Sequence, residues 1–176
     1  GREIDTAVVV GIGYPDDDIF VTMNRRNLDL TSAALSPAGL VTARRWLQKD
    51  TSFGGAETFL KIIETEIQPR VAALLQVDAR RQMLWGHSLG GYFALLALFT
   101  QPTTFHTVIA SDPAIFWDER SVLGFEAAFR QGVSERRFAP RVMLTYMGKG
   151  QTPYQALPGA SAEELAAVNA RVRDAR

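Results

Sequence analysis

The chain has 176 residues, of which 47% are hydrophobic, and its 19 lysines and arginines balance its 19 aspartates and glutamates. This length and composition suffice for one domain with a hydrophobic core, whereas zero net charge offers no basic field for nucleic acid or an anionic membrane. The absence of cysteine excludes disulfides, thiolate metal sites and cysteine nucleophiles, and two histidines are too few for a histidine-rich metal site. We therefore expect no metal, no cofactor and no nucleic-acid partner.

The sequence shows no secretion-signal pattern and no apolar run long enough to span a membrane. It leaves open whether the protein works in the periplasm or the cytoplasm, and it does not determine the oligomeric state. Its first five residues lead straight into a buried-looking apolar segment, which is an abrupt start for a native domain.

The predicted elements alternate between strands and helices in chain order. Residues 7–12 form a continuous apolar run, which is typical of a parallel strand covered on both faces. The elements that follow are a helix at 56–68 that kinks or restarts at Pro69, a strand at 83–85, a helix at 89–100, a strand at 107–110, a helix at 119–130 and a strand at 142–146. This alternation predicts an α/β fold, a parallel sheet with right-handed crossovers and helices on both faces, in one domain over residues 1–176.

The C-terminal segment begins with a capping box, Ser161-Ala-Glu-Glu164, in which the serine and the glutamate satisfy each other's backbone N–H groups. Leu165, Val168 and Val172 then recur on one face, which predicts a helix. In this architecture such a helix leads to another strand. We therefore expect these residues to be the central portion of a larger domain.

The stretch Gly86-His-Ser-Leu-Gly-Gly91 lies between a predicted strand and a predicted helix. A serine hydroxyl is a weak nucleophile, so its site must aim it outward, remove its proton and stabilise the oxyanion that forms. On a strand-to-helix elbow Ser88 is held in a strained conformation. The small residues two before and two after it let the strand and the helix pass closely. The Leu89 N–H then faces the oxyanion. The alternative is a glycine-rich helix start that packs closely on the sheet.

Four stretches together resemble the esterase D group of the α/β hydrolases. They are the segment from Trp85 to Phe93, Ile109-Ala-Ser-Asp-Pro-Ala114, Gly54-Gly-Ala-Glu-Thr-Phe59 with Ile67-Gln-Pro69, and Arg26-Asn-Leu-Asp-Leu-Thr31. The similarity is greatest to the siderophore esterases of that group, which cleave the esters of catecholate trilactones such as enterobactin. The resemblance implies an α/β-hydrolase sheet, Ser88 as the nucleophile, Leu89 as one oxyanion donor, and Arg26 as a contact for an acidic or catecholate substrate. For Arg26 the alternative is an ion pair with Asp29 that pins a loop.

The catalytic base of that family has no counterpart in this chain. The family's histidine follows the final strand, and no histidine follows His106 here. His106 comes after the helix that leaves the elbow, and at 1.5 Å per residue that helix carries the chain roughly 18 Å toward the opposite end of the sheet. His87 is adjacent to Ser88 on a sharp turn and points elsewhere, so we expect both histidines to be structural.

The acid and the second oxyanion donor are also missing from their expected places. Residues 147–153, where many α/β hydrolases carry the acid, contain none, although Asp112 and Asp118 could approach the site from the strand at 107–110. The family's second oxyanion donor lies on a segment upstream of residues 7–12.

The first functional hypothesis is a serine ester hydrolase that acts on siderophore lactones or related esters through an acyl-serine intermediate, with a histidine outside this chain as base. Trp85 and Phe93 favour it over a general carboxylesterase or an S-formylglutathione hydrolase. A hypothesis of another class is a non-catalytic, hydrolase-like module that binds a ligand and needs no base. We expect the 176 residues alone to be inactive or nearly so, because loss of the base lowers serine hydrolase turnover by about 10⁴ to 10⁶.

Overall fold

The computed structural model describes residues 7–32, 35–37, 39, 41, 43 and 51–146. By its contacts the chain divides into a unit of residues 1–145 and a unit of residues 146–176, and the elements below belong to the first. The helix predicted from Ser161 and the stretch 147–153 lie outside the described residues. The single domain over residues 1–176 stays a prediction.

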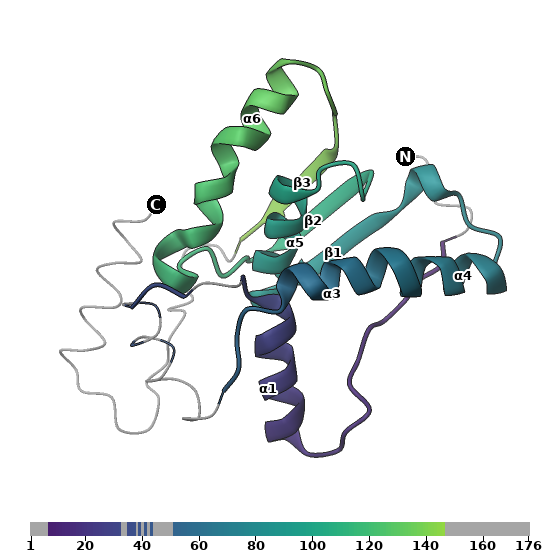
Figure 1. The fold of residues 1–176 in the computed structure, drawn as a ribbon. Coiled ribbons are helices and arrows are strands. Elements are labelled where there is room, and N and C mark those ends of the chain that lie inside the picture. Colours follow the sequence, from purple (N-terminus) through teal and green to yellow (C-terminus); the bar gives the residue numbers. More distant parts are fainter. Residues whose placement is uncertain are drawn as a thin grey trace. The chain divides into compact units, whose positions relative to one another are not determined.

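A parallel three-stranded sheet carries the described fold (Figure 1). Its strands are β1 (Met83–His87), β2 (Thr107–Ser111) and β3 (Arg141–Thr145), in the order β1-β2-β3. The register places Met83 opposite Thr107 and Thr107 opposite Arg141, so the three strands end together at one edge of the sheet. The predicted α/β class with a parallel sheet is confirmed, and these three strands lie within two residues of their predicted bounds.

Helix α5 (Leu89–Thr100) packs on β1 and β2 and is the centre of the hydrophobic core. Every side chain from Gly91 to Leu98 is buried, because a helix that is apolar on all sides needs cover on all sides. The sheet covers one side, and the ring of Phe59 lies 5.4 Å from that of Phe93 on another. Phe99 contacts Phe129 at 5.3 Å between ring centroids.

The predicted irregularity at Pro69 is a π-helical turn within one continuous run of helix, after which a new α-helical segment begins with Pro69 in its first turn. This run of helix consists of α3 (Ala56–Ile62), the π-helical turn η1 (Ile63–Ile67) and α4 (Gln68–Leu74). The Gln68 N–H bonds to the Ile63 carbonyl oxygen five residues earlier, which widens the helix by one residue. Proline has no N–H and its ring collides with an ordinary helical turn, so the wider turn accommodates Pro69 without a break.

An aspartate side chain caps the N-terminus of each of two further helices. Helix α1 (Ile19–Leu30), which has no counterpart among the predicted elements, begins where the Asp18 side chain accepts the Phe20 N–H. The short helix η2 (Ala79–Arg81) begins in the same way at Asp78. In both cases the aspartate satisfies a backbone donor that the first turn leaves free.

The strand predicted at residues 7–12 is wrong. This segment belongs to no strand, and Val9 is 92% exposed. A strand requires a neighbour that completes its hydrogen-bond ladder, and β1 pairs only with β2 in the described part of the sheet. The apolar composition therefore predicted that residues 7–12 are buried in the sheet, but no described strand lies beside them.

The helix predicted at 119–130 is wrong in its first half. Asp118, Glu119 and Arg120 have φ between 47° and 68°, the 3₁₀-helical segment η3 spans Trp117–Phe125, and helix α6 runs from Glu126 to Ser134. The Asp118 carboxylate accepts the Ser36 N–H at 2.7 Å, and Glu119 accepts the Ser36 hydroxyl at 3.2 Å. These long-range bonds hold residues in a left-handed conformation that local sequence disfavours.

The sheet face opposite α5 carries exposed apolar side chains in the described structure. Met83 and Trp85 of β1 are 56% and 63% exposed, and Met143 of β3 is 53% exposed. Cover by helices on this second face therefore stays a prediction.

Candidate active site at the strand-to-helix elbow

Ser88 occupies the sharp turn between β1 and α5. Its backbone has φ 56° and ψ −118°, a region that non-glycine residues rarely enter. Three hydrogen bonds of 3.0 Å hold this conformation: the Ser88 N–H donates to the Ser111 carbonyl, and the Ser88 carbonyl accepts from the N–H groups of Tyr92 and Ala114. The strand–turn–helix arrangement that the motif predicts is therefore present.

Two glycines allow the close passage of strand and helix. A Cβ added to Gly86 would lie 2.0 Å from the backbone oxygen of Gly90, and one added to Gly91 would lie 2.9 Å from the Cα of Pro113. A Cβ on Gly90 would meet no atom within 4 Å. The steric requirement thus falls on Gly86 and Gly91, whereas the sequence pattern assigned it to the positions two before and two after the serine.

The polar environment of Ser88 suits attack on a carbonyl. Within the described part of the chain, no group forms a hydrogen bond with its Oγ. Leu89 is the first residue of α5, so its N–H has no acceptor within the helix, and the positive end of the helix dipole lies there. The Leu89 N–H and the positive end of the helix both favour a developing negative charge beside Ser88.

Neither histidine of the chain serves Ser88 as a base in the described structure. His87 is the exposed last residue of β1 and forms no hydrogen bond with Ser88. His106 precedes β2, and its Nδ1 lies 3.2 Å from the Thr107 hydroxyl. Because β1 and β2 are parallel and in register, His106 lies at the far end of the sheet, about 15 Å from the elbow along a five-residue strand.

The loop after β2 packs beside the elbow and separates the two candidate acids. The Asp112 N–H donates to the Thr145 carbonyl at 2.7 Å, and the adjacent Pro113 contacts Gly91, so Asp112 lies next to the elbow by its backbone. Asp118 is 8% exposed and its carboxylate is engaged by the backbone of Ser36. The Asp118 carboxylate is therefore already held by the Ser36 backbone.

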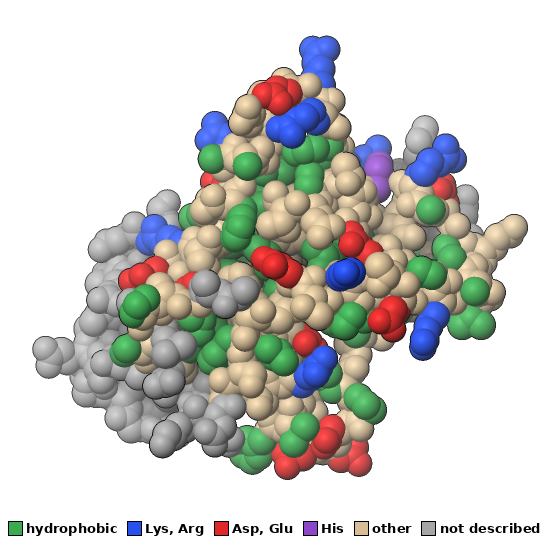
Figure 2. All heavy atoms as spheres, viewed as in Figure 1, with side chains coloured by type: hydrophobic (Ala, Val, Ile, Leu, Met, Phe, Trp, Pro, Cys, Tyr) green, Lys and Arg blue, Asp and Glu red, His purple; other side chains and the backbone are tan. Residues whose placement is uncertain are grey.

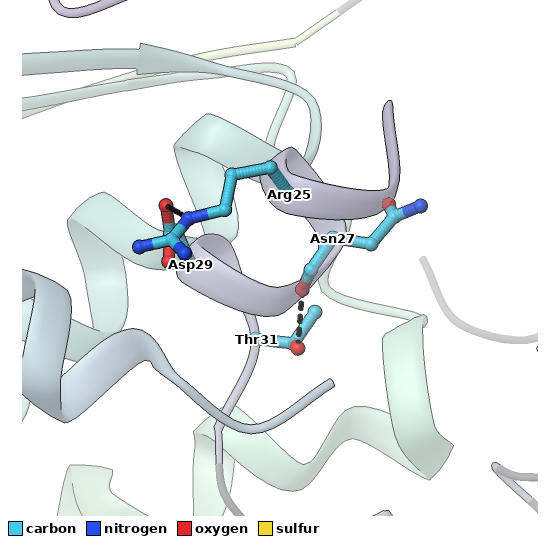
Figure 3. Close-up of polar contacts among 4 residues, drawn as sticks. All are labelled: Arg25, Asn27, Asp29 and Thr31. Atoms are coloured by element: carbon cyan, nitrogen blue, oxygen red, sulfur yellow. Dashed lines mark hydrogen bonds and ion pairs between the residues drawn. The ribbon is translucent and has the colours of Figure 1, made fainter. Parts of the chain in front are cut away.

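The end of α1 is tied to the first turn of α5 through buried hydroxyls. The Tyr92 hydroxyl lies 2.9 Å from Ser32 Oγ and 2.9 Å from Ser121 Oγ, and the Thr31 hydroxyl donates to the Asn27 carbonyl at 2.6 Å (Figure 3). Sequence reasoning missed the contacts of Tyr92 with Ser32 and Ser121, because these residues are far from Tyr92 in the chain and no motif links them. They fix the C-terminal end of α1 beside the first turn of α5.

The structure pairs Asp29 with Arg25 and not with Arg26. Arg25 Nε lies 2.9 Å from Asp29 Oδ2, and the Asp29 side chain is only 7% exposed (Figure 3). The alternative ion pair that the sequence suggested for Arg26 is therefore wrong. Arg26 is half-buried and forms no ion pair with any described residue, and burial lowers the pKa of its guanidinium.

The phenol of Tyr14 belongs to the same cluster. Burial raises the pKa of Tyr14 from 10.0 to about 12, and the negative charge of Asp29 adds to this effect. The folded protein therefore keeps the Tyr14 proton between about pH 10 and pH 12, where the unfolded chain has lost it. The resulting contribution to the free energy of unfolding is complete below pH 10 and is lost as the pH rises through 12.

We expect a tyrosinate titration followed by ultraviolet absorbance to lose its component near pH 12 in Tyr14→Phe. As a control, Asp29→Asn removes the neighbouring negative charge and is expected to move that component to lower pH. A difference titration between the wild type and Tyr14→Phe centred near pH 10 would show that Tyr14 is not buried beside Asp29.

The described residues carry no preformed site for a metal ion and no membrane span. They contain no group of three or more His, Cys, Asp or Glu side chains placed to hold a metal, and none of their helices is long and apolar enough to cross a bilayer. Figure 2 shows acidic and basic side chains mixed over most of the visible face, in keeping with the zero net charge.

Comparison with known proteins finds similarity to siderophore esterases. The chain is 37% identical over 117 residues to the ferri-bacillibactin esterase BesA of Bacillus subtilis, and this match covers 66% of the chain and 39% of the relative. It is 36% identical over 152 residues to the siderophore enterobactin esterase of Emericella nidulans, covering 83% and 48%. The solved structure of the siderophore hydrolase EstA from Aspergillus nidulans matches with a TM-score of 0.67 at 34% identity, covering 92% of this chain and 55% of that one.

The chain thus spans less than half the length of the curated relatives it matches. The sequence profile of the family described as "Putative esterase" matches residues 3–169, which is nearly all of the chain. The chain therefore belongs to this esterase family.

Proposed function

We propose that this chain carries the nucleophile of a serine ester hydrolase that cleaves siderophore trilactones or related esters. The observation that supports it best is Ser88 itself, a non-glycine residue at φ 56° on a strand-to-helix turn with no hydrogen-bond partner for its Oγ among the described residues. Strain of this kind persists only where the surroundings enforce it, and it is common at functional sites.

In the proposed reaction, Ser88 Oγ attacks the ester carbonyl carbon while a base takes its proton. The carbonyl oxygen becomes an oxyanion that accepts the Leu89 N–H. Collapse of the tetrahedral intermediate breaks the ester bond, and the leaving alcohol receives the proton from the protonated base. Water then attacks the acyl-serine in the same way and releases the acid. The base is a histidine outside these 176 residues, since His87 and His106 do not reach Ser88.

The proposed substrate class follows from the relatives and from one side chain. The relatives named above are esterases of ferri-bacillibactin and enterobactin. Arg26 is a half-buried cation without a carboxylate partner among the described residues, so it is a suitable contact for an acidic or catecholate group of such a substrate.

The decisive experiment is a labelling and turnover assay on the full-length gene product. A serine-directed phosphonate is expected to form one adduct on Ser88, identified by peptide mass spectrometry. The labelled protein should lose the ability to hydrolyse enterobactin. The unlabelled protein should cleave enterobactin faster than an acyl thioester such as S-formylglutathione.

Three outcomes would overturn parts of this proposal. Faster thioester cleavage would favour an S-formylglutathione hydrolase. Equal cleavage of simple esters would favour a general carboxylesterase. No adduct on Ser88 would favour a non-catalytic binding module, whose site needs no base.

The segment of 176 residues, expressed alone, is expected to turn over esters about 10⁴ to 10⁶ times more slowly than the full-length gene product. Without a general base only orientation and oxyanion stabilisation remain. The measurement is kcat for p-nitrophenyl butyrate with both proteins, after circular dichroism has shown that the segment is folded. A folded segment with full turnover would show that a base lies within the chain.

A further inference from the structure

Two adjacent arginines on α1 compete for one carboxylate. Asp29 is four residues after Arg25 and three residues after Arg26, and both spacings bring side chains together on a helix. Tyr14 also lies close to this buried carboxylate. Helical spacing alone therefore permits either pair.

The structure resolves the competition in favour of Arg25. Its Nε–Oδ2 distance to Asp29 is 2.9 Å, and the Arg25 side chain is 54% exposed, so Arg25 reaches the carboxylate from the solvent side. Figure 3 shows the Arg25 side chain folded along the helix onto Asp29. Arg26 remains without an ion pair in the described structure although it is half-buried.

Hydrogen bonds link the C-terminal end of α1, the helix that carries Arg26, to the elbow. Arg26 lies four residues, or about 6 Å along the helix axis, before Leu30, the last residue of α1, and Ser32 follows two residues later. Ser32 Oγ is 2.9 Å from the Tyr92 hydroxyl, and the Tyr92 N–H bonds to the Ser88 carbonyl. The helix that carries Arg26 is thus tied at its C-terminal end to the first turn of α5, which begins beside Ser88.

We propose that Arg25 is a positioning residue which occupies Asp29 and thereby keeps Arg26 unpaired and available to an anionic group of the substrate. This inference rests on the proposed function, since it requires an ester substrate at Ser88. It assigns Arg25 no contact with the substrate. The role of Arg25 is to prevent the i, i+3 ion pair between Arg26 and Asp29.

The proposal makes a prediction that a merely structural role for Arg25 does not make. In Arg25→Gln the buried Asp29 loses its charged partner and captures Arg26, so the affinity for anionic substrates falls. Removing Asp29 as well, in Arg25→Gln/Asp29→Asn, leaves nothing to capture Arg26, so the affinity returns. A second mutation would thus repair the first.

The test uses the full-length gene product and two esters of matched length, p-nitrophenyl hemisuccinate, which carries a carboxylate, and p-nitrophenyl butyrate, which does not. We expect KM for the hemisuccinate to rise about tenfold in Arg26→Gln, in line with the loss of one charge-assisted contact. It should rise roughly 3- to 10-fold in Arg25→Gln, and it should stay within about twofold of wild type in Arg25→Lys and in the double variant. KM for the butyrate should change less than about twofold in Arg25→Gln, in Arg25→Lys and in the double variant.

The matched control is Arg130→Gln, which removes another exposed i, i+4 arginine pair, with Glu126 at 3.9 Å on α6. It should leave both KM values unchanged. The role of Arg25 is overturned if Arg25→Gln changes KM equally for the two esters. It is also overturned if the double variant has the melting temperature of Arg25→Gln but its hemisuccinate KM does not return toward wild type. If Arg26→Gln leaves the hemisuccinate KM unchanged, the substrate contact is wrong. If Ser88→Ala keeps full activity, the proposed hydrolase itself fails.

Discussion

Ser88→Ala in the full-length gene product is expected to lower kcat for ester hydrolysis by about 10⁴ to 10⁶. The substitution removes only the Oγ that forms the acyl intermediate. The backbone bonds to Ser111, Tyr92 and Ala114 are main-chain interactions and remain. KM should change little, since the chemical step and not the binding site is altered. The measurement is kcat and KM for enterobactin by chromatographic product analysis.

Ser88→Gly provides the control that separates chemistry from folding. Glycine adopts φ 56° without a Cβ clash, whereas serine and alanine in this region cost about 1–3 kcal/mol. We therefore expect Ser88→Gly to be as inactive as Ser88→Ala but more stable than it by about 1 kcal/mol in urea unfolding. Residual turnover near the wild-type value in both variants would show that another group is the nucleophile.

Gly86→Ala is expected to destabilise the protein by about 1–3 kcal/mol and to abolish the labelling of Ser88 by a serine-directed phosphonate. The added methyl group would lie 2.0 Å from the backbone oxygen of Gly90, and a backbone atom cannot move aside as a flexible side chain can. Strand β1 and helix α5 must then separate, which displaces Ser88. Urea denaturation gives the stability, and mass spectrometry after phosphonate treatment gives the reactivity.

Gly90→Ala is the matched control, because the same methyl group four residues later meets no atom within 4 Å. Within a helix this change is expected to stabilise by about 0.5–1 kcal/mol. Equal destabilisation by Gly86→Ala and Gly90→Ala would show that the elbow does not depend on the close passage at Gly86.

Local sequence predicted the parts of this fold that depend on short-range chemistry. The glycine frame around Ser88, the apolar strand before it and the apolar helix after it all carry their signal within about twenty residues, and the structure has all three. The role of Ser88 as nucleophile, of Leu89 as oxyanion donor and of Arg26 as substrate contact stay predictions for the experiments above.

Distant residues decided the rest. The left-handed residues 118–120 are held by Ser36, and no local pattern indicates a partner so far away in the chain. Residues 7–12 have the composition of a buried strand, yet a strand exists only with a neighbour beside it. Apolar composition permits a buried strand, but hydrogen bonds to a neighbouring strand determine whether one forms.

The sequence by itself determined the α/β class and the elbow, because hydrophobic periodicity and glycine spacing act between residues that are close in the chain. Only the tertiary structure decided that Asp29 binds Arg25 and that Gly86, not Gly90, carries the steric constraint. Each choice is between two residues of the same type, two arginines or two glycines, that the local sequence does not distinguish. The choices are made by burial and by contact with other elements, which helical spacing does not encode.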